Sequence, residues 1–316
     1  MLRIAINGYG RIGRCLVRAL FERDLQRKIH LCAINDLGDP ATLAHLTRFD
    51  STFGRFAGQV DLQGDLLQID DQPIHLLRER EVINLPWQQH GIDLVLECTG
   101  KLKKRVQVEQ HLTAGSPRVL LSHPLDSADL TVVYGVNHEL LGSQQIVSNA
   151  SCTTNCLAPV VKVLHESFGV ERGLMTTTHA YTNDQRILDL MHTDLRRARA
   201  AALNIVPTST GAAKAIGLVM PELRGKLHGM ALRVPVPTVS VVDLVADLKH
   251  AATAETINEA LKKAAEGHLK GILAYCDKPL VSSDFRGHPA SAIIDAISTV
   301  VLEGKMAKVI AWYDNE

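Results

Sequence analysis

Three glycines close to the N-terminus constrain the fold more strongly than any other feature of the sequence. Gly8, Gly10 and Gly13 follow a strand-like apolar run at residues 4–6, and apolar residues with helical spacing come after them. Between a strand and a helix, the first glycine permits a tight turn, the second lets the backbone approach a pyrophosphate, and the third lets the helix pack against the strand. The motif therefore predicts a dinucleotide-binding unit with the phosphates at the helix N-terminus.

The residue after the next predicted strand indicates which dinucleotide binds. Residues 30–34 form a second apolar run, and Asp36 follows it. In dinucleotide-binding units, the acidic residue that binds the ribose 2′-hydroxyl lies about twenty residues after the glycine motif, and Asp36 lies at about this distance. A carboxylate there would repel a 2′-phosphate, which favours NAD over NADP. The alternative is an ordinary surface acid after a strand, and the neighbouring glycine motif makes it the weaker interpretation.

Two further apolar runs extend the same sheet. Residues 93–98 and 118–122 read as strands buried on both faces, and residues 102–114 between them read as a helix that ends at Gly115. Alternating strands and helices predict a Rossmann-type, doubly wound α/β domain, which we expect to end near residue 150. Because ligands lie at the carboxyl ends of parallel strands, Thr99, Gly100 and Ser122 are candidates for the cofactor site.

The second half of the chain contains a cysteine in a setting typical of nucleophiles. Cys152 follows Ser151 in a run of small polar residues, and an apolar segment with helical spacing comes next. With Ser151 or a neighbour as the cap, Cys152 lies at the helix N-terminus, where free N–H groups favour a thiolate and can stabilise an oxyanion. The alternatives are a buried structural cysteine and a disulfide between Cys152 and Cys156.

His179 is the candidate base for this nucleophile. It follows a strand-like run at residues 173–178. A lone histidine at a strand end is more often structural, but a cysteine nucleophile elsewhere in the chain favours the catalytic interpretation. Later runs at residues 239–248 and 309–313 predict a largely antiparallel sheet covered on one face by helices such as residues 255–265. The second half therefore reads as an α+β domain.

Two further features are candidates for binding anions. Thr210 and Gly211 precede an alanine-rich helix. A hydroxyl and a glycine N–H at a helix start suit an anion, although such residues also form ordinary caps. Arg233 lies in an extended run and is either a solvated edge residue or a phosphate ligand. The long irregular segment at residues 183–209 carries several arginines, and such segments are usually functional or form interfaces.

The composition argues against several other classes of protein. The 316 residues include 34 basic and 34 acidic side chains, which argues against a sequence-independent nucleic-acid footprint. The basic run at residues 101–105 is read as a solvated helix face. The six cysteines show no zinc-type spacing, so we expect no metal, and their sparseness fits a reducing cytoplasm. The chain opens directly into a strand-like run, so we expect neither a signal peptide nor a membrane span.

Taken together, these motifs resemble those of the phosphorylating, NAD-dependent glyceraldehyde-3-phosphate dehydrogenase family over essentially the whole chain. The most specific stretches are residues 5–14, 148–156, 179–182, 209–215 and 312–316. The resemblance implies oxidation and phosphorylation of D-glyceraldehyde 3-phosphate to 1,3-bisphosphoglycerate, in glycolysis or gluconeogenesis, by a cytoplasmic homotetramer. Cys152 is then the nucleophile that forms a thioester, and His179 is the base.

The resemblance also implies the binding residues. The substrate's own phosphate is assigned to Thr182 and Arg233. The attacking inorganic phosphate is assigned to Ser151, Thr153, Thr210 and Gly211. The NAD site is assigned to Arg11, Ile12, Asp36, Arg80 and Ser122, with Asn315 orienting the nicotinamide carboxamide. The irregular segment at residues 181–209 resembles the family's S-loop at a tetramer interface, where Arg196, Arg197 or Arg199 adds positive potential.

The expected domains are an NAD-binding domain at residues 1–150 and a catalytic domain at residues 151–313. Residues 314–316 begin a C-terminal segment that looks truncated, because family members usually continue as a helix. Residues 85–87 and 122–124 are more similar to erythrose-4-phosphate dehydrogenases, which release an acid. The substrate-side motifs at residues 179–185 and 209–211 favour the triose phosphate.

Two alternatives of other classes remain open at this stage. The first is a cysteine–histidine hydrolase or acyltransferase, which the glycine motif and Asp36 oppose because such enzymes do not need NAD. The second is a secondary RNA- or protein-binding role, which the zero net charge makes the weaker interpretation for RNA.

Overall fold

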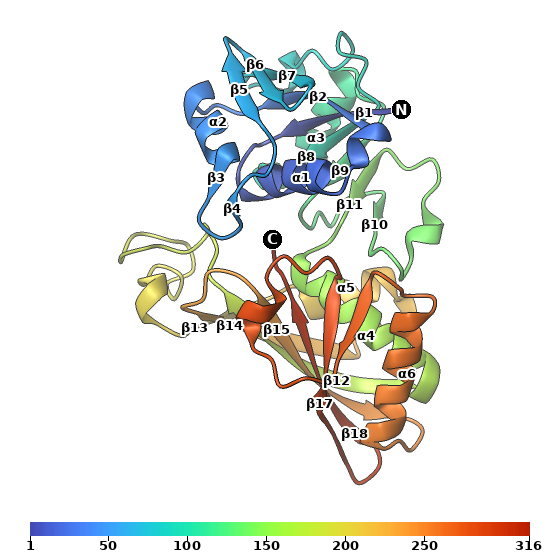
Figure 1. Ribbon diagram of the computed structural model, residues 1–316. Helices are drawn as coiled ribbons and strands as arrows, with labels where there is room; N and C mark the ends of the chain where they lie inside the picture. The colour runs from blue at the N-terminus through green and yellow to red at the C-terminus, as the bar shows by residue number, and fades with distance from the viewer. The chain divides into compact units, whose positions relative to one another are not determined.

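The computed structural model describes residues 1–316. Its internal contacts divide the chain into two compact units, residues 1–132 with 141–150, and residues 133–140 with 151–316. Residues 133–140 therefore group with the second unit, although they precede the boundary near residue 150 that the sequence suggests. Each unit is described by itself below (Figure 1).

The first unit is built on a nine-stranded sheet in the order β10-β11-β9-β8-β1-β2-β7-β6-β5. Every neighbouring pair from β10 to β7 is parallel, and β7, β6 and β5 form an antiparallel meander at one edge. The strands are β1 (Leu2–Asn7), β2 (Ile29–Asn35), β5 (Val60–Gln63), β6 (Leu66–Ile69), β7 (Gln72–Leu77), β8 (Leu94–Glu97), β9 (Val119–Leu121), β10 (Leu130–Thr131) and β11 (Ile146–Ser148), with a separate pair, β3 (Phe49–Asp50) and β4 (Gly54–Arg55).

Local sequence explains where the helices of this unit begin and end. In α2 (Pro40–Arg48), Asp39 caps the N-terminus by accepting a hydrogen bond from Thr42, and Pro40 occupies the first turn. The helix expected at residues 102–114 is α3 (Arg105–Thr113), and Gly115 follows it with a φ of 104°. The remaining helices are α1 (Arg11–Glu22) and the 3₁₀ turns η1 (Leu25–Arg27) and η2 (Val82–Asn84).

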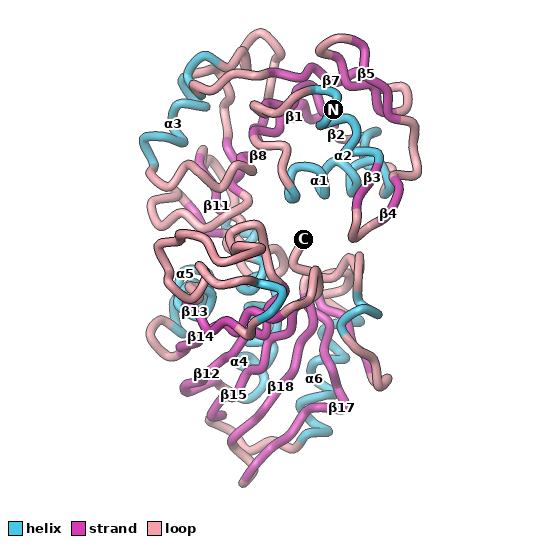
Figure 2. The backbone as a smooth tube through the Cα atoms, turned by 90° about the vertical axis from the view of Figure 1, so that its left-hand side faces the viewer, coloured by secondary structure: helices cyan, strands magenta, loops and turns pink.

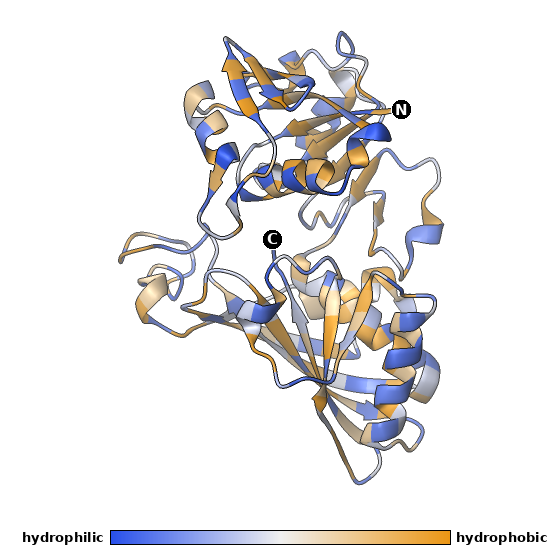
Figure 3. Ribbon diagram, viewed as in Figure 1, coloured by the Kyte–Doolittle hydropathy of each residue, from blue (hydrophilic) through white to orange (hydrophobic).

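Buried aliphatic side chains on the parallel strands form the core of the first unit. Ile6, Leu31 and Ile34 are essentially inaccessible to solvent, and Trp87 is fully buried in a neighbouring cluster. Figure 3 shows this pattern as hydrophobic colouring along the central strands. The sequence prediction of a doubly wound parallel sheet is confirmed.

The second unit is built on a seven-stranded sheet in the order β13-β14-β12-β15-β18-β17-β16. Four of its six neighbouring pairs are antiparallel, and β12–β14 and β16–β17 are parallel. The prediction of a largely antiparallel sheet is therefore confirmed. The strands are β12 (Val170–Ala180), β13 (Val206–Ser209), β14 (Leu227–Val234), β15 (Ser240–Leu248), β16 (Leu273–Cys276), β17 (Ala292–Leu302) and β18 (Met306–Tyr313).

Two long helices pack against this sheet (Figure 2). The buried α4 (Cys152–Phe168) contacts β12, β15, β17 and β18, while α6 (Ala254–Glu266) packs on β16 and β17. Every second residue of β15 is buried, as a strand covered on one face requires. The unit also contains α5 (Ala212–Val219) and the 3₁₀ turns η3 (His138–Leu140), η4 (Ala201–Leu203), η5 (Pro221–Leu223) and η6 (Ser282–Phe285). None of the chain's helices combines the length and the apolar character needed to traverse a lipid bilayer.

Candidate active site

Cys152 is the first residue of α4, as the sequence predicts. The cap is Ser151, whose hydroxyl accepts a hydrogen bond of 3.1 Å from the backbone N–H of Thr154. Cys152 and Cys156 are both free thiols, so the alternative of a disulfide between them is excluded. The thiol of Cys156 is buried and donates toward the carbonyl of Ala311, which makes it a structural residue.

His179, at the end of β12, lies beside the sulfur. Its Nε2 is 3.4 Å from Cys152 Sγ, and its Nδ1 is 2.6 Å from the carbonyl oxygen of Ala180. Arg233 Nη1, which can only donate, also lies 3.1 Å from Nδ1, so these two contacts call for opposite tautomers. The contact to the carbonyl is the shorter of the two and a carbonyl can only accept, so we assign the proton to Nδ1. The lone pair of Nε2 therefore faces the thiol, which is the arrangement that a general base requires.

Burial and a nearby cation set the protonation states of this pair. Burial raises the pKa of the Cys152 thiol, and the opposing effects of Arg233 and of hydrogen bonds from Thr153 do not reverse the rise. Burial, followed by Arg233, lowers the pKa of His179 to about 4. Burial thus opposes the effect of the helix N-terminus, which the sequence predicts to favour a thiolate.

Thr153 connects the nucleophile to the core of the second unit. Its hydroxyl lies 2.8 Å from that of Tyr313 on β18, which lies 2.8 Å from the hydroxyl of Thr177 on β12. Thr153 and Tyr313 are buried, and the Tyr313 ring meets the His179 ring edge-on at 5.9 Å. The sequence alone suggests no role for Tyr313 at this site, because a tyrosine in a strand reads as an ordinary core residue. The phosphate contact expected of Thr153 stays a prediction.

Arg233 and Thr182 lie together on the other side of His179. Arg233 Nη1 donates to the carbonyl of Ala180 at 3.1 Å and to the hydroxyl of Thr182 at 3.4 Å. Burial and the charge of Arg197 lower the pKa of Arg233, and its Nε has no hydrogen-bond partner. A half-buried guanidinium with an unused donor is suited to an anion.

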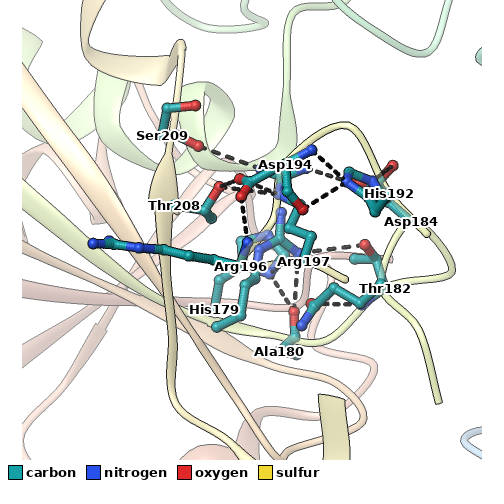
Figure 4. Close-up of polar contacts among 12 residues, drawn as sticks. His179, Ala180, Thr182, Asp184, His192, Asp194, Arg196, Arg197, Thr208 and Ser209 are labelled. Carbon is teal, nitrogen blue, oxygen red and sulfur yellow. Dashed lines mark hydrogen bonds and ion pairs between the residues drawn. The ribbon is translucent and has the colours of Figure 1, made fainter. Parts of the chain in front are cut away.

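Arg197 is the arginine of the irregular segment that reaches this site. Figure 4 shows it among Asp184, Asp194, Thr208 and Ser209. It forms an ion pair with Asp184 and donates from Nε to the Thr208 hydroxyl at 3.0 Å. Its charge lowers the pKa of both His179 and Arg233. Arg199 instead pairs with the exposed Asp189, so the structure distinguishes between arginines that the sequence could not separate.

Thr210 and Gly211 lie at the start of α5, next in the chain to Ser209. The Thr210 hydroxyl accepts a hydrogen bond of 3.2 Å from the N–H of Ala212. No side chain caps the helix at Gly211, and a Cβ there would meet nothing within 4 Å. Beyond this hydrogen bond, no side chain covers the exposed turn, and the anion site that the sequence suggests here stays a prediction.

The glycine motif of the first unit has the geometry of a phosphate-binding turn. Gly8 has a φ of 94°, and a Cβ on Gly13 would approach the carbonyl oxygen of Gly8 to 2.4 Å. A Cβ on Gly10, in contrast, would meet nothing within 4 Å, and no side chain caps α1 at this residue. An open helix N-terminus lined by glycine fits a pyrophosphate.

The other residues assigned to NAD lie at the carboxyl ends of the same strands. The Asp36 carboxylate accepts hydrogen bonds of 2.8 Å from the N–H groups of Tyr9 and Gly38, which fixes it beside the glycine turn. Arg11 is held by an ion pair with Asp50. Arg80 is exposed, and Ile12 lies in the first turn of α1. Thr99, Gly100 and Ser122 follow β8 and β9 as expected.

Asn315 belongs to the second unit, immediately after β18. Its side-chain oxygen accepts a hydrogen bond of 2.9 Å from the Ser240 hydroxyl, and Ser240 Oγ in turn accepts from the N–H of Ala180. Asn315 is thereby tied to the strand end that carries His179. Its role toward the nicotinamide stays a prediction.

Comparisons with known proteins agree with this arrangement. Residues 2–105 match the family model described as glyceraldehyde 3-phosphate dehydrogenase, NAD binding domain, and residues 151–315 match the model for its C-terminal domain. Proteins named glyceraldehyde-3-phosphate dehydrogenase from Geobacillus stearothermophilus and Xanthobacter flavus are 55% and 54% identical to this chain. One from Bacillus subtilis is 52% identical, and each alignment covers 100% of this chain and 94% of the relative. The chain belongs to the glyceraldehyde-3-phosphate dehydrogenase family.

Proposed function

We propose that the protein catalyses the NAD-dependent oxidation and phosphorylation of D-glyceraldehyde 3-phosphate to 1,3-bisphosphoglycerate. The observation that carries this proposal is the 3.4 Å contact between Cys152 Sγ and His179 Nε2, with Arg233 beside the pair. The names of the relatives support the same activity and do not favour erythrose 4-phosphate as the substrate.

The first step is addition of the Cys152 sulfur to the aldehyde carbon. The thiol proton passes to His179 Nε2 and from there to the former carbonyl oxygen, which gives a hemithioacetal. The N–H groups at the start of α4 stabilise the negative charge that develops on this oxygen. Because Nδ1 of His179 stays bonded to Ala180, the imidazole keeps the tautomer that accepts the proton.

Oxidation then gives a thioester on Cys152. His179 takes the hydroxyl proton, while bound NAD supplies the acceptor for the hydride. An oxygen of inorganic phosphate attacks the thioester carbon, the carbon–sulfur bond breaks, and the acyl phosphate leaves. The Cys152 sulfur regains a proton from His179, which returns the pair to its resting state.

Two cationic groups suit the two phosphates of this reaction. We assign the substrate's phosphate to Arg233 and Thr182, which lie together beside His179. We assign the attacking phosphate to Ser151, Thr153, Thr210 and Gly211, with Arg197 as the neighbouring cation. Arg233 lowers the pKa of His179. A phosphate dianion on Arg233 offsets that charge, so substrate binding strengthens the base.

The first unit is proposed to hold NAD through the glycine turn, Arg11, Ile12, Asp36 and Arg80, with Thr99, Gly100 and Ser122 at the neighbouring strand ends. The open space at Gly10 supports this assignment. Asp36 accepts only two backbone hydrogen bonds, which leaves lone pairs for a ribose hydroxyl.

We propose that the protein is a homotetramer, as the family resemblance implies, and the surface of the irregular segment supports association of subunits. Ile187, Met191, Leu195 and Leu203 are each at least 80% exposed in the single chain, which is unusual for large apolar side chains. Light scattering tests the assembly, and a monomeric mass would contradict it.

The free thiols suit the reducing cytoplasm, where we place the enzyme.

NADH formation in the presence of the aldehyde, NAD and phosphate tests the activity. The proposal expects turnover on glyceraldehyde 3-phosphate that requires phosphate and is lost in Cys152→Ser. Faster, phosphate-independent turnover on erythrose 4-phosphate would replace the proposal with the sister activity. Ester or thioester cleavage without any use of NAD would instead favour a hydrolase.

A further inference from the structure

A carboxylate that the proposed chemistry does not use lies buried at the end of β8. Glu97 has no solvent exposure, and neither has His111 on α3, which it contacts. An uncompensated carboxylate at such a position would be very costly, so its partners must explain why it is there.

Four donors converge on the two oxygens of Glu97. Asn7 Nδ2 donates to Oε2 at 2.6 Å, and His111 Nε2 lies 3.0 Å from the same oxygen. The backbone N–H of Thr99 donates to Oε1 at 2.9 Å, and the Thr99 hydroxyl donates to it as well. Burial raises the pKa of Glu97, but these hydrogen bonds outweigh the effect and bring it below the ordinary value. The carboxylate is therefore ionised and fully hydrogen-bonded.

The buried Trp87 determines which ring nitrogen of His111 carries the proton. The indole N–H can only donate, and it lies 2.9 Å from His111 Nδ1. Nδ1 is consequently the acceptor, so Nε2 bears the proton that is directed at Glu97. Trp87 and His111 thus define one side of the carboxylate site.

On the other side, the network crosses the carboxyl ends of four adjacent strands, β8, β1, β2 and β7 (Figure 1). Asn7 ends β1 and accepts a hydrogen bond of 2.7 Å from Asn35, which ends β2. Asn35 donates to the carbonyl of Glu79 at 2.9 Å and accepts from its N–H at 2.9 Å, just after β7. One buried chain of hydrogen bonds therefore runs from Glu97 to Glu79.

Each anchored residue is next to a part of the proposed nucleotide site. Asn7 precedes Gly8, Asn35 precedes Asp36, and Glu79 precedes Arg80. Thr99 supports the glycine turn directly, since a Cβ on Gly8 would lie only 2.6 Å from its backbone nitrogen. A shift of Thr99 or Asn7 would consequently displace the turn that receives the pyrophosphate.

We propose that Glu97 is a positioning residue for NAD, which acts through Asn7, Thr99 and Asn35 to hold the nucleotide-binding loops in register. The inference rests on the proposed NAD site, and it assigns to Glu97 no contact with the cofactor or the substrate. Its effect is on the affinity for NAD, because the groups that perform the chemistry belong to the second unit.

Replacement of Glu97 by glutamine tests the network with little change in shape. Each carboxylate oxygen of Glu97 accepts two hydrogen bonds. In glutamine one of these oxygens is replaced by an NH₂ group, which cannot accept, so two donors lose their acceptor whichever way the amide is turned. Thr99 or Asn7 must then move. We expect the Kd of NAD to rise by about tenfold or more, the loss that an unpaired buried donor produces. The turnover number at saturating NAD should stay within about twofold of wild type, because no reacting group is altered.

Asn35→Ala is the second variant, and it keeps the ionised group paired. It removes only the link from Asn7 to Glu79, so we expect a stable protein whose Kd for NAD rises by roughly threefold to tenfold. Thr299→Val is the matched control. It deletes a partly buried hydrogen bond of 2.8 Å to Asn258 in the second unit, and it should lower the melting temperature without changing the affinity for NAD.

Calorimetric titration with NAD and the full steady-state kinetics separate the outcomes. A raised Kd and a raised KM for NAD with a nearly unchanged kcat support the proposal. If either variant, Glu97→Gln or Asn35→Ala, folds and binds NAD as tightly as wild type, the network has only a structural role and the proposal is overturned. A loss of kcat with an unchanged KM for NAD would also overturn it. If Glu97→Gln does not fold, Asn35→Ala decides. If the wild-type protein itself binds no NAD, the proposed function is contradicted. That result differs from the one that contradicts only the role of Glu97, in which wild type and variants bind NAD equally well.

Discussion

The hydroxyls of Tyr313 and Thr153 lie 2.8 Å apart at the first turn of α4. Thr153 follows Cys152 in α4, and its hydroxyl lowers the pKa of the thiol. Tyr313 also binds Thr177 at 2.8 Å, so a single phenol joins α4, β12 and β18 at the site. The position of the reacting sulfur is thus fixed by a residue near the end of the chain.

Tyr313→Phe should slow the reaction of Cys152. Without the phenol, Thr153 and Thr177 each lose a buried partner, and the protein loses about 1–3 kcal/mol of stability. A Thr153 hydroxyl that is no longer held donates less well to the sulfur, so the pKa of the thiol rises. The pH dependence of iodoacetamide alkylation measures this shift. The partly exposed Tyr275→Phe is the control, and equal alkylation profiles for all three proteins would contradict the prediction.

Arg233→Leu and Arg197→Leu should affect different substrates. Arg233 lies against Thr182 and His179, so its loss should raise the KM of the aldehyde by about tenfold to a hundredfold, a charged hydrogen bond being worth roughly 1.5–3 kcal/mol. Arg197 borders Thr208 and Ser209, so its loss should raise mainly the KM of inorganic phosphate. The exposed Arg172→Leu should change neither constant. Steady-state kinetics with each substrate varied are the measurement, and an exchange of the two effects would reverse the phosphate assignments.

The substitutions Gly10→Ala and Gly13→Ala should have different effects, the first on the affinity for NAD and the second on the stability of the protein. A Cβ at Gly10 meets no protein atom, so Gly10→Ala should keep its melting temperature within a few degrees while losing affinity for NAD. A Cβ at Gly13 would lie 2.4 Å from a carbonyl oxygen, so Gly13→Ala should lower the melting temperature clearly. Thermal denaturation with and without NAD measures both. An unchanged affinity in Gly10→Ala would mean that the cofactor does not approach this turn.

Glu97 should contribute to stability in a pH-dependent way. Its pKa is lowered from 4.5 in the folded protein, so its contribution is complete above about pH 4.5 and is lost as the pH falls through the folded value. Leaving a buried donor without its acceptor typically costs about 1–3 kcal/mol. The difference in unfolding free energy between wild type and Glu97→Gln should therefore be largest near neutrality and shrink in acid. A difference that stays constant down to the lowest pH at which both proteins fold would contradict an ionised Glu97.

The strands and helices nearest to chemistry were predictable because they combine periodic apolar residues with clear caps. The glycine turn, Asp36, Ser151 and the strand before His179 are of this kind. The meander β5–β7 and strand β17 were not predicted, since their pairing depends on partners distant in the chain. The burial around Cys152 was not predicted, because the local sequence shows the helix terminus but not the packing that opposes its effect on the pKa of the thiol.

Other parts of the site depend on long-range packing and have no local signal. Tyr313 lies 160 positions from Thr153 in the chain, and Glu97 and Asn7 are 90 positions apart. Arg197 and not Arg199 lies at the site, because Arg197 pairs with Asp184 and Arg199 pairs with Asp189. Such pairings arise only when the strands of each sheet are assembled.

The measurement that tests the central claim most directly is a single turnover without phosphate. Enzyme mixed with NAD and glyceraldehyde 3-phosphate should form one NADH per active site in a burst, and mass spectrometry should find the acyl group on Cys152. Added phosphate should then release it and restore turnover. His179→Asn should slow the burst by about a hundredfold or more, the usual contribution of a general base. Steady NADH formation that needs no phosphate, or an acyl group on any residue other than Cys152, would contradict the account.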